Sequence, residues 1–182
     1  MIKTLDYQRR AVNDLIDKAL HLLEMEGDRQ RIVLRSPTGS GKTVMCSEML
    51  DRLATALADS RHHGAALIWI APNQLHQQSY MKMRNYFTET RVLHPVMYDE
   101  LDHSVDGFIH PGEVLFTNWE SINKDTNLMV RDSEQQSSLY DICRRTKEQG
   151  LPIIVVVDEA HSFYGGETRA QKAVATKSQK VL

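Results

Sequence analysis

The residues best suited to chemistry lie in the segment S-P-T-G-S-G-K-T at residues 36–43. This segment follows the apolar run at residues 32–34 and precedes a helical pattern, an order typical of a phosphate-binding loop. Glycines allow a tight turn, so that successive backbone N–H groups can face phosphate oxygens. In such a loop Lys42 contacts the β- and γ-phosphates, and the Thr43 hydroxyl binds Mg²⁺. The spacing predicts an ATP site formed by Ser36, Thr38, Gly39, Ser40, Gly41, Lys42 and Thr43.

A pair of carboxylates follows a second apolar run, I-I-V-V-V-D-E-A-H at residues 153–161. Five consecutive β-branched residues predict a parallel strand buried on both faces, and open α/β sheets bind ligands where such strands end. Asp158 is suited to hold Mg²⁺ through water, and Glu159 to orient or deprotonate an attacking water. Taken alone, the first segment could be an ordinary Ser/Gly-rich turn, and the second could be a strand followed by a solvated acidic turn. Their joint occurrence in this order favours nucleotide binding.

The composition is typical of an ordinary soluble globular domain. Its 182 residues suit one domain, and 41% hydrophobic with 25% charged residues allow a normal core. A net charge of −2 provides no overall basic field, although a local basic face is compatible with it. Cys46 and Cys143 are too few for a disulfide framework or a zinc site, and Cys46 falls on the apolar face of a predicted helix. No apolar run reaches the ~20 residues that span a bilayer, and the first residues lack a signal-peptide core. We therefore expect a cytoplasmic location and no membrane partner.

Alternating helix and strand patterns predict an α/β fold, a mostly parallel sheet with helices on both faces. The expected helices cover residues 7–25, 43–57, 73–87, 139–149 and 167–179, with a helical turn at 118–122. The expected strands cover residues 31–35, 65–70, 91–97, 113–117 and 153–157. Pro95 makes the third of these an edge or irregular strand. Residues 98–112 and 123–138 are predicted to be surface loops.

With these segments in place, the chain resembles the first RecA-like lobe of superfamily 2 helicases. Within that group it is most similar to the DEAH-containing restriction subunits of type III restriction enzymes. D-E-A-H at residues 158–161 matches the second motif of the family. The phosphate loop of the family has Ala or Ser at its first position, which accounts for Ser36. The resemblance implies one RecA-like P-loop lobe over residues 1–182, in which His161 links the nucleotide site to the second-lobe side of the cleft.

Three shorter matches lie in the order that the family has. L-D-Y-Q-R-R-A-V at residues 5–12 resembles the glutamine motif, which implies that Gln8 reads the adenine edge and that Tyr7 packs nearby. The segments at 69–75 and 114–122 resemble motifs that contact the nucleic-acid backbone. The implied contact residues are Pro72, Asn73, Gln74, Thr117 and Asn118. Each match also has a structural explanation: a helix start, an N-cap, or a strand-to-helix turn. Trp119 suits core packing better than base stacking.

The resemblance implies an ATP-dependent nucleic-acid helicase or translocase from a restriction-type enzyme, with Mg²⁺–ATP hydrolysis by water activated at Glu159. DNA is the expected substrate, although backbone contacts alone do not separate DNA from RNA. A second RecA-like lobe, in the same chain or another, would supply an arginine to the transition state. The lobe is therefore expected to be incomplete and weakly active by itself, and a methylase or specificity subunit is a further expected partner. Two alternatives remain, a stand-alone nucleotide-binding regulatory module and a protein-remodelling ATPase that binds no nucleic acid.

Overall fold

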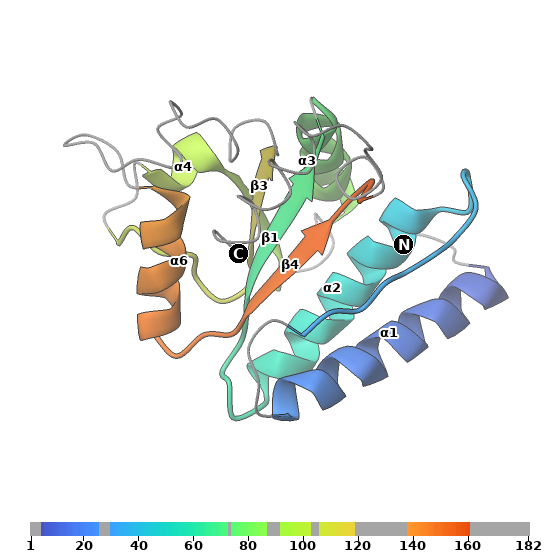
Figure 1. The fold of residues 1–182 in the computed structure, drawn as a ribbon, viewed down its shortest axis with the longest axis horizontal. Coiled ribbons are helices and arrows are strands. Elements are labelled where there is room, and N and C mark those ends of the chain that lie inside the picture. Colours follow the sequence, from blue (N-terminus) through green and yellow to red (C-terminus); the bar gives the residue numbers. More distant parts are fainter. Residues whose placement is uncertain are drawn as a thin grey trace, which may run out of the picture.

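The computed structural model describes residues 5–25, 30–72, 74–86, 92–102, 106–118 and 138–160. These residues form a four-stranded sheet of order β2-β3-β1-β4 with helices on both faces (Figure 1). The helices are α1 (Asp6–Glu24), α2 (Lys42–Ala58), α3 (Leu75–Tyr86), α4 (Tyr98–Asp102) and α6 (Leu139–Glu148). The strands are β1 (Ala66–Ala71), β2 (His94–Met97), β3 (Glu113–Asn118) and β4 (Ile153–Val157). All three strand pairs are parallel, so the predicted RecA-like α/β fold is confirmed.

The central strand is β1, which pairs with β3 on one edge and with β4 on the other. Its six residues are all buried, as expected for a parallel strand covered on both faces. Successive side chains point to opposite faces of the sheet. Leu67 and Trp69 consequently pack against one layer of helices, and Ile68 and Ile70 against the other. This strand therefore holds the two cores together.

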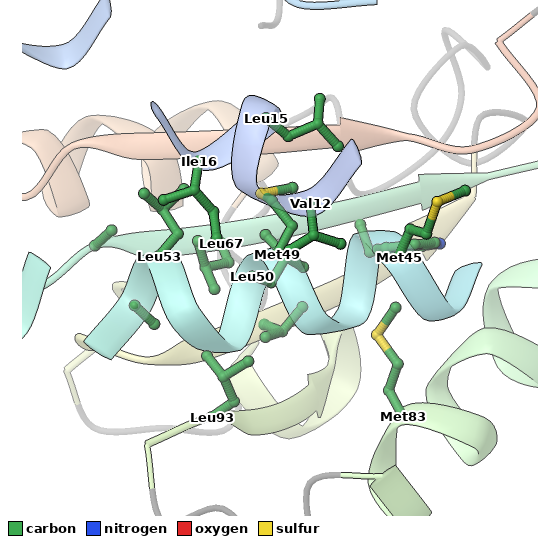
Figure 2. Packing of buried hydrophobic residues seen from close by; sticks show 14 of the residues in the cluster. Val12, Leu15, Ile16, Met45, Met49, Leu50, Leu53, Leu67, Met83 and Leu93 are labelled. Atoms are coloured by element: carbon green, nitrogen blue, oxygen red, sulfur yellow. The ribbon is translucent and has the colours of Figure 1, made fainter. Parts of the chain in front are cut away.

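The first core lies between the sheet and helices α1, α2 and α3. Leu53 and Val12, from α2 and α1, are fully buried and lie between the two helices and the sheet (Figure 2). Leu67 from β1 and Met83 from α3 complete the same cluster. The helical spacing of apolar residues predicted both α1 and α2, because a stripe at three- and four-residue intervals must be covered.

The second core lies on the opposite face, beneath α4 and α6. Leu139 and Ile142 of α6 are fully buried against Ile68 of β1 and Leu115 of β3. Ser138 caps α6, since its side chain accepts a hydrogen bond from the Asp141 N–H. Figure 1 shows α6 and α4 on the side of the sheet away from α1 and α2. Helices thus cover both faces, as the alternating pattern predicts.

The strand predicted at residues 31–35 is wrong, because residues 30–37 form no hydrogen-bonded strand in the described structure. Val33 is 75% exposed, and Ile32 is 38% exposed. A strand needs a ladder partner, and β4 is paired only with β1 among the described residues. The sequence predicts that β4 is buried on both faces, but the strand is half-buried, because its outer edge has no neighbouring strand among the described residues.

The loop predicted at residues 98–112 differs at its start, where residues 98–102 form α4. Tyr98 and Leu101 are buried against the second core, and this burial favours a helical turn over a solvated loop. The expected edge position of Pro95 is confirmed, because β2 is the outer strand beside β3. No helix among the described residues is long and apolar enough to cross a membrane.

Several predictions fall outside the described residues. They are the helical turn at 118–122 beyond Asn118, the environment of Trp119, the loop at 123–138 before Ser138, and the helix at 167–179.

A charged cluster surrounds His110 at the start of β3. The His110 Nε2 lies 3.0 Å from Asp106 Oδ2, and its Nδ1 lies 3.2 Å from Glu113 Oε2. Burial by itself lowers the pKa of His110, but the hydrogen bonds and charges of Asp106 and Glu113 outweigh it and raise the pKa overall. The same loop is attached to α6, because the Ile109 N–H donates to Thr146 Oγ1 at 3.0 Å.

The raised pKa of His110 predicts a pH-dependent stability. Its contribution is fully present below the ordinary pKa of histidine and is lost as the pH rises through the raised value. Thermal unfolding of His110→Gln between pH 5 and pH 9 should show a lower midpoint than wild type in acid and a shrinking difference in alkali. His94→Gln, an exposed histidine at the sheet edge, is the matched control. A difference that grows with pH would contradict the assignment.

Candidate nucleotide-binding site

The loop at residues 36–41 turns on two glycines with left-handed backbone conformations. Gly39 has φ of 80° and Gly41 has φ of 83°, a region that side-chain-bearing residues rarely adopt. The Ser40 N–H donates to the Pro37 carbonyl at 3.2 Å and closes the turn. The backbone conformation favours glycine at position 41, and a Cβ there would lie 2.5 Å from the Gln8 Nε2 and displace that amide.

The loop leads directly into the N-terminus of α2. Gly41 is its N-cap and provides no side-chain hydrogen bond, and no acidic residue lies in the first turn. The first N–H groups of a helix have no intrahelical acceptor and carry a partial positive charge. A helix start without its own cap or carboxylate is suited to an anion such as a phosphate.

Lys42 lies over the loop instead of pointing into solvent. Its Nζ donates to the carbonyl oxygens of Ser36 and Pro37, each at 3.3 Å. The Ser36 hydroxyl donates to Ser40 Oγ at 2.5 Å, which links the two ends of the loop. Ser36 therefore forms a contact that the glycine of the strict motif could not make. These contacts keep the ammonium group beside the start of the loop, at Ser36 and Pro37, which is called the mouth of the loop below.

The first turn of α1 packs against the same loop. The Gln8 Nε2 donates to the Ser40 carbonyl at 2.9 Å, and the Tyr7 hydroxyl donates to the same oxygen at 2.8 Å. The Gln8 Oε1 accepts from the Leu5 N–H at 2.8 Å, so both ends of the amide are engaged. The structure thus places Gln8 at the loop and gives its amide a role in holding the loop backbone.

Asp158 follows β4 at the carboxyl edge of the sheet. Its N–H donates to the Ile70 carbonyl at 2.8 Å, which continues the β1–β4 ladder by one residue. Burial raises the pKa of its carboxyl group, and the charge of Glu159 adds to the increase. The hydrogen bond from the Glu159 N–H and the charges of Lys42 and Lys82 act in the opposite direction. The carboxylate is therefore half-buried and within electrostatic reach of Lys42.

Glu159 adopts a strained backbone conformation, with φ of 50°. This region costs a residue with a Cβ roughly 1–2 kcal/mol. The Glu159 N–H donates to Asp158 Oδ1 at 2.9 Å, and this hydrogen bond belongs to the turn that holds the conformation. Strained residues of this kind concentrate at functional sites, which agrees with the role predicted for the Glu159 carboxylate.

The donor set fits Mg²⁺ that arrives with a nucleotide. Thr43 in the first turn of α2 and Asp158 after β4 both offer oxygen ligands, and Mg²⁺ typically uses one or two protein oxygens with phosphates and waters. Within residues 5–160, excluding the gaps stated above, no group of three or more His, Cys, Asp or Glu residues could hold a metal.

A parallel α/β sheet with a glycine loop, a lysine at the start of the following helix and an aspartate after a strand defines a P-loop nucleoside triphosphatase domain. The family model of the type III restriction enzyme res subunit matches residues 1–182. The chain belongs to this family, a helicase superfamily 2 domain, and the resemblance seen in its motifs is confirmed. No curated protein and no solved structure matches the chain significantly.

Four of the residues predicted to contact nucleic acid are described, and they lie at or just after the carboxyl ends of β1 and β3: Pro72, Gln74, Thr117 and Asn118. Ala71 is aligned with Asn118 in the ladder, so Gln74 and Asn118 emerge from neighbouring strands. Gln74 is exposed and Asn118 is half-buried, whereas Pro72 is buried. Thr117 is only 1% exposed, which argues against a direct contact by its side chain. Asn73 and His161 lie outside the described residues.

Two neighbours of the site were not predicted. Lys82 of α3 lowers the pKa of Asp158, although nothing in the sequence relates these residues. Cys46 lies one turn after Lys42, and burial, together with the charge of Asp158, raises the pKa of its thiol to about 12. The thiol therefore stays protonated and packs as an apolar group, as the helical pattern predicts.

The raised pKa of Asp158 predicts that its charge destabilises the fold at neutral pH. A group with a raised folded-state pKa contributes stability only below its unfolded pKa, and this contribution is lost as the pH rises through the folded value. Asp158→Asn should therefore raise the thermal midpoint at pH 7, with a gain that disappears near pH 4. Asp17→Asn, on the exposed side of α1, is the matched control. A lower midpoint for Asp158→Asn at pH 7 would contradict this electrostatic account.

Proposed function

We propose that this lobe binds Mg²⁺–ATP at the loop and hydrolyses it as the motor domain of a DNA helicase or translocase. The observation that carries the proposal is the position of Lys42. Its ammonium group lies at the mouth of the loop, at the N-terminus of α2, within electrostatic reach of Asp158. In a nucleotide complex the phosphates lie between this cation and the carboxylate.

Phosphoryl transfer requires positioning and charge stabilisation more than covalent chemistry. Lys42 and the first N–H groups of α2 bind the phosphate oxygens. Glu159 accepts a proton from the attacking water and orients it for in-line attack. Thr43 and Asp158 would hold Mg²⁺, which would supply positive charge to offset that of the phosphates. Gln8, whose amide contacts the loop, is proposed to read the adenine edge.

The proposed nucleic-acid contacts in the described part of the chain are Gln74 and Asn118, at the carboxyl edge of the sheet. Asn73, between Pro72 and Gln74 in the sequence, is proposed as a further contact. Membership of the restriction-subunit family supports DNA as the substrate. A second RecA-like lobe supplies the arginine that stabilises the transition state, in the same chain or in a partner. The lobe alone should therefore hydrolyse ATP slowly.

Substitution of Lys42 tests the nucleotide site. Lys42→Ala should weaken binding of a fluorescent ATP analogue roughly 10–100-fold, because it removes a charge-assisted contact to phosphate. Lys147→Ala, on the exposed side of α6, should bind like wild type. Glu159→Gln should keep the affinity and lose the slow hydrolysis. Wild-type affinity in Lys42→Ala would refute the site.

A salt series tests the nucleic-acid partner. Binding of labelled duplex DNA should weaken linearly in log affinity as log salt rises, since phosphate contacts release counterions. Gln74→Ala and Asn118→Ala should each lower this affinity a few-fold, and Gln149→Ala beyond α6 should not. Binding of RNA in preference to DNA would contradict DNA as the proposed substrate and favour RNA. Absence of any salt-dependent binding would favour a regulatory module or a protein-remodelling ATPase.

A further inference from the structure

Tyr7 makes a contact to the phosphate loop that its place in the sequence does not suggest. Its hydroxyl donates to the Ser40 carbonyl at 2.8 Å across 33 residues of chain. Tyr7 is 44% exposed, so a substantial part of its side chain faces solvent. An exposed aromatic ring beside a nucleotide loop would ordinarily suggest stacking on the base. The hydroxyl contact indicates a different role.

The acceptor of this contact, the Ser40 carbonyl, belongs to the peptide that joins the loop to α2. Ser40 directly precedes Gly41, the N-cap of α2. A trans peptide is planar, so the Ser40 carbonyl and the Gly41 N–H point in opposite directions. Fixing the carbonyl toward α1 consequently directs the Gly41 N–H away from α1, toward the side where the loop curls. The two glycines have no side chain that could hold this plane by packing.

Gln8 and Tyr7 both donate to the Ser40 carbonyl, but their side chains differ in how many other contacts hold them. Gln8 is 8% exposed, and its amide is fixed by the Leu5 N–H as well as by Ser40. Within the described part of the chain, the Tyr7 side chain makes one hydrogen bond, through its hydroxyl, and its ring belongs to neither apolar core. Removing the hydroxyl therefore changes the loop contact and almost nothing else.

We infer that Tyr7 is a positioning residue of the phosphate loop, which orients the Ser40–Gly41 peptide through its hydroxyl and sets affinity for the polyphosphate part of the ligand. Its ring does not determine which base is bound. This inference rests on the proposed nucleotide site and goes further by separating polyphosphate affinity from base recognition at the α1 side of the loop.

The test uses a ligand without a base. Tyr7→Phe and Tyr7→Ala are compared with wild type for ATP, GTP and inorganic tripolyphosphate, with binding followed by displacement of a fluorescent ATP analogue. Loss of one neutral hydrogen bond should weaken all three ligands by the same factor, about 3–10-fold. The ratio of ATP to GTP affinity should stay unchanged. Tyr140→Phe, an exposed tyrosine on α6, should match wild type for every ligand.

Each contrary result has a distinct meaning. Wild-type tripolyphosphate affinity in Tyr7→Phe would overturn the inference, and so would a loss confined to ATP in Tyr7→Ala, which would indicate base stacking. Thermal unfolding without ligand should give the same midpoint for Tyr7→Phe and wild type, so a lowered midpoint with unaltered affinity also counts against it.

Lys42→Ala distinguishes failure of the Tyr7 role from failure of the nucleotide site. If it abolishes tripolyphosphate binding while Tyr7→Phe does not change it, only the role of Tyr7 fails. If wild type binds neither ATP nor tripolyphosphate, the nucleotide site and this inference both fail.

Discussion

The parallel ladder between β1 and β4 is the constraint on which the acidic half of the site depends. It aligns Ala66 with Ile153 and Ile70 with Val157, and the Asp158 N–H extends it by donating to the Ile70 carbonyl at 2.8 Å. A slip of one residue would exchange the two faces of β4, and the half-buried β-branched residues of this strand belong to two different cores. Since β1 is buried throughout, it cannot adjust to such a slip. The register therefore fixes Asp158 at the sheet edge where β1 and β3 also end.

The other half of the site depends on helix packing. The loop itself is rich in glycine and exposed residues, so it has little core of its own. Its position comes from α2, which is buried against the sheet through residues such as Leu53, and from α1, which packs on α2 through Val12. A hydrogen bond from Arg52 Nη1 to Asn13 Oδ1 at 2.8 Å joins the outer sides of the two helices. This packing brings the first turn of α1 to the Ser40 carbonyl, so the conformation of the loop is inherited from the core.

The sequence was sufficient for features that depend on local pattern. Apolar stripes indicated α1 and α2, an apolar run indicated β1, a β-branched run indicated β4, and Pro95 indicated the edge strand. The strand at residues 31–35 was predicted wrongly because a ladder depends on a distant partner, which a local run of apolar residues does not specify. The motif placed Ser36 and Lys42 in one loop, but it could not indicate that the loop carbonyls are the acceptors of Lys42 and Tyr7. Those contacts join segments that meet only after the helices pack.

The electrostatics of the site explain why its cation remains available to a ligand. Burial raises the pKa values of both Asp158 and Cys46, and the charge of Lys42 opposes the rise at each group, so its charge acts across the sheet edge. In the described part of the chain, however, the Lys42 Nζ donates to two neutral carbonyls, those of Ser36 and Pro37, and to no carboxylate. A close ion pair with Asp158 would be costly to break, whereas two long hydrogen bonds of 3.3 Å are replaced at little cost. A phosphate oxygen carries charge and therefore competes well against such acceptors. The loop thus holds Lys42 in place with contacts weak enough for the phosphate of the proposed ligand to replace.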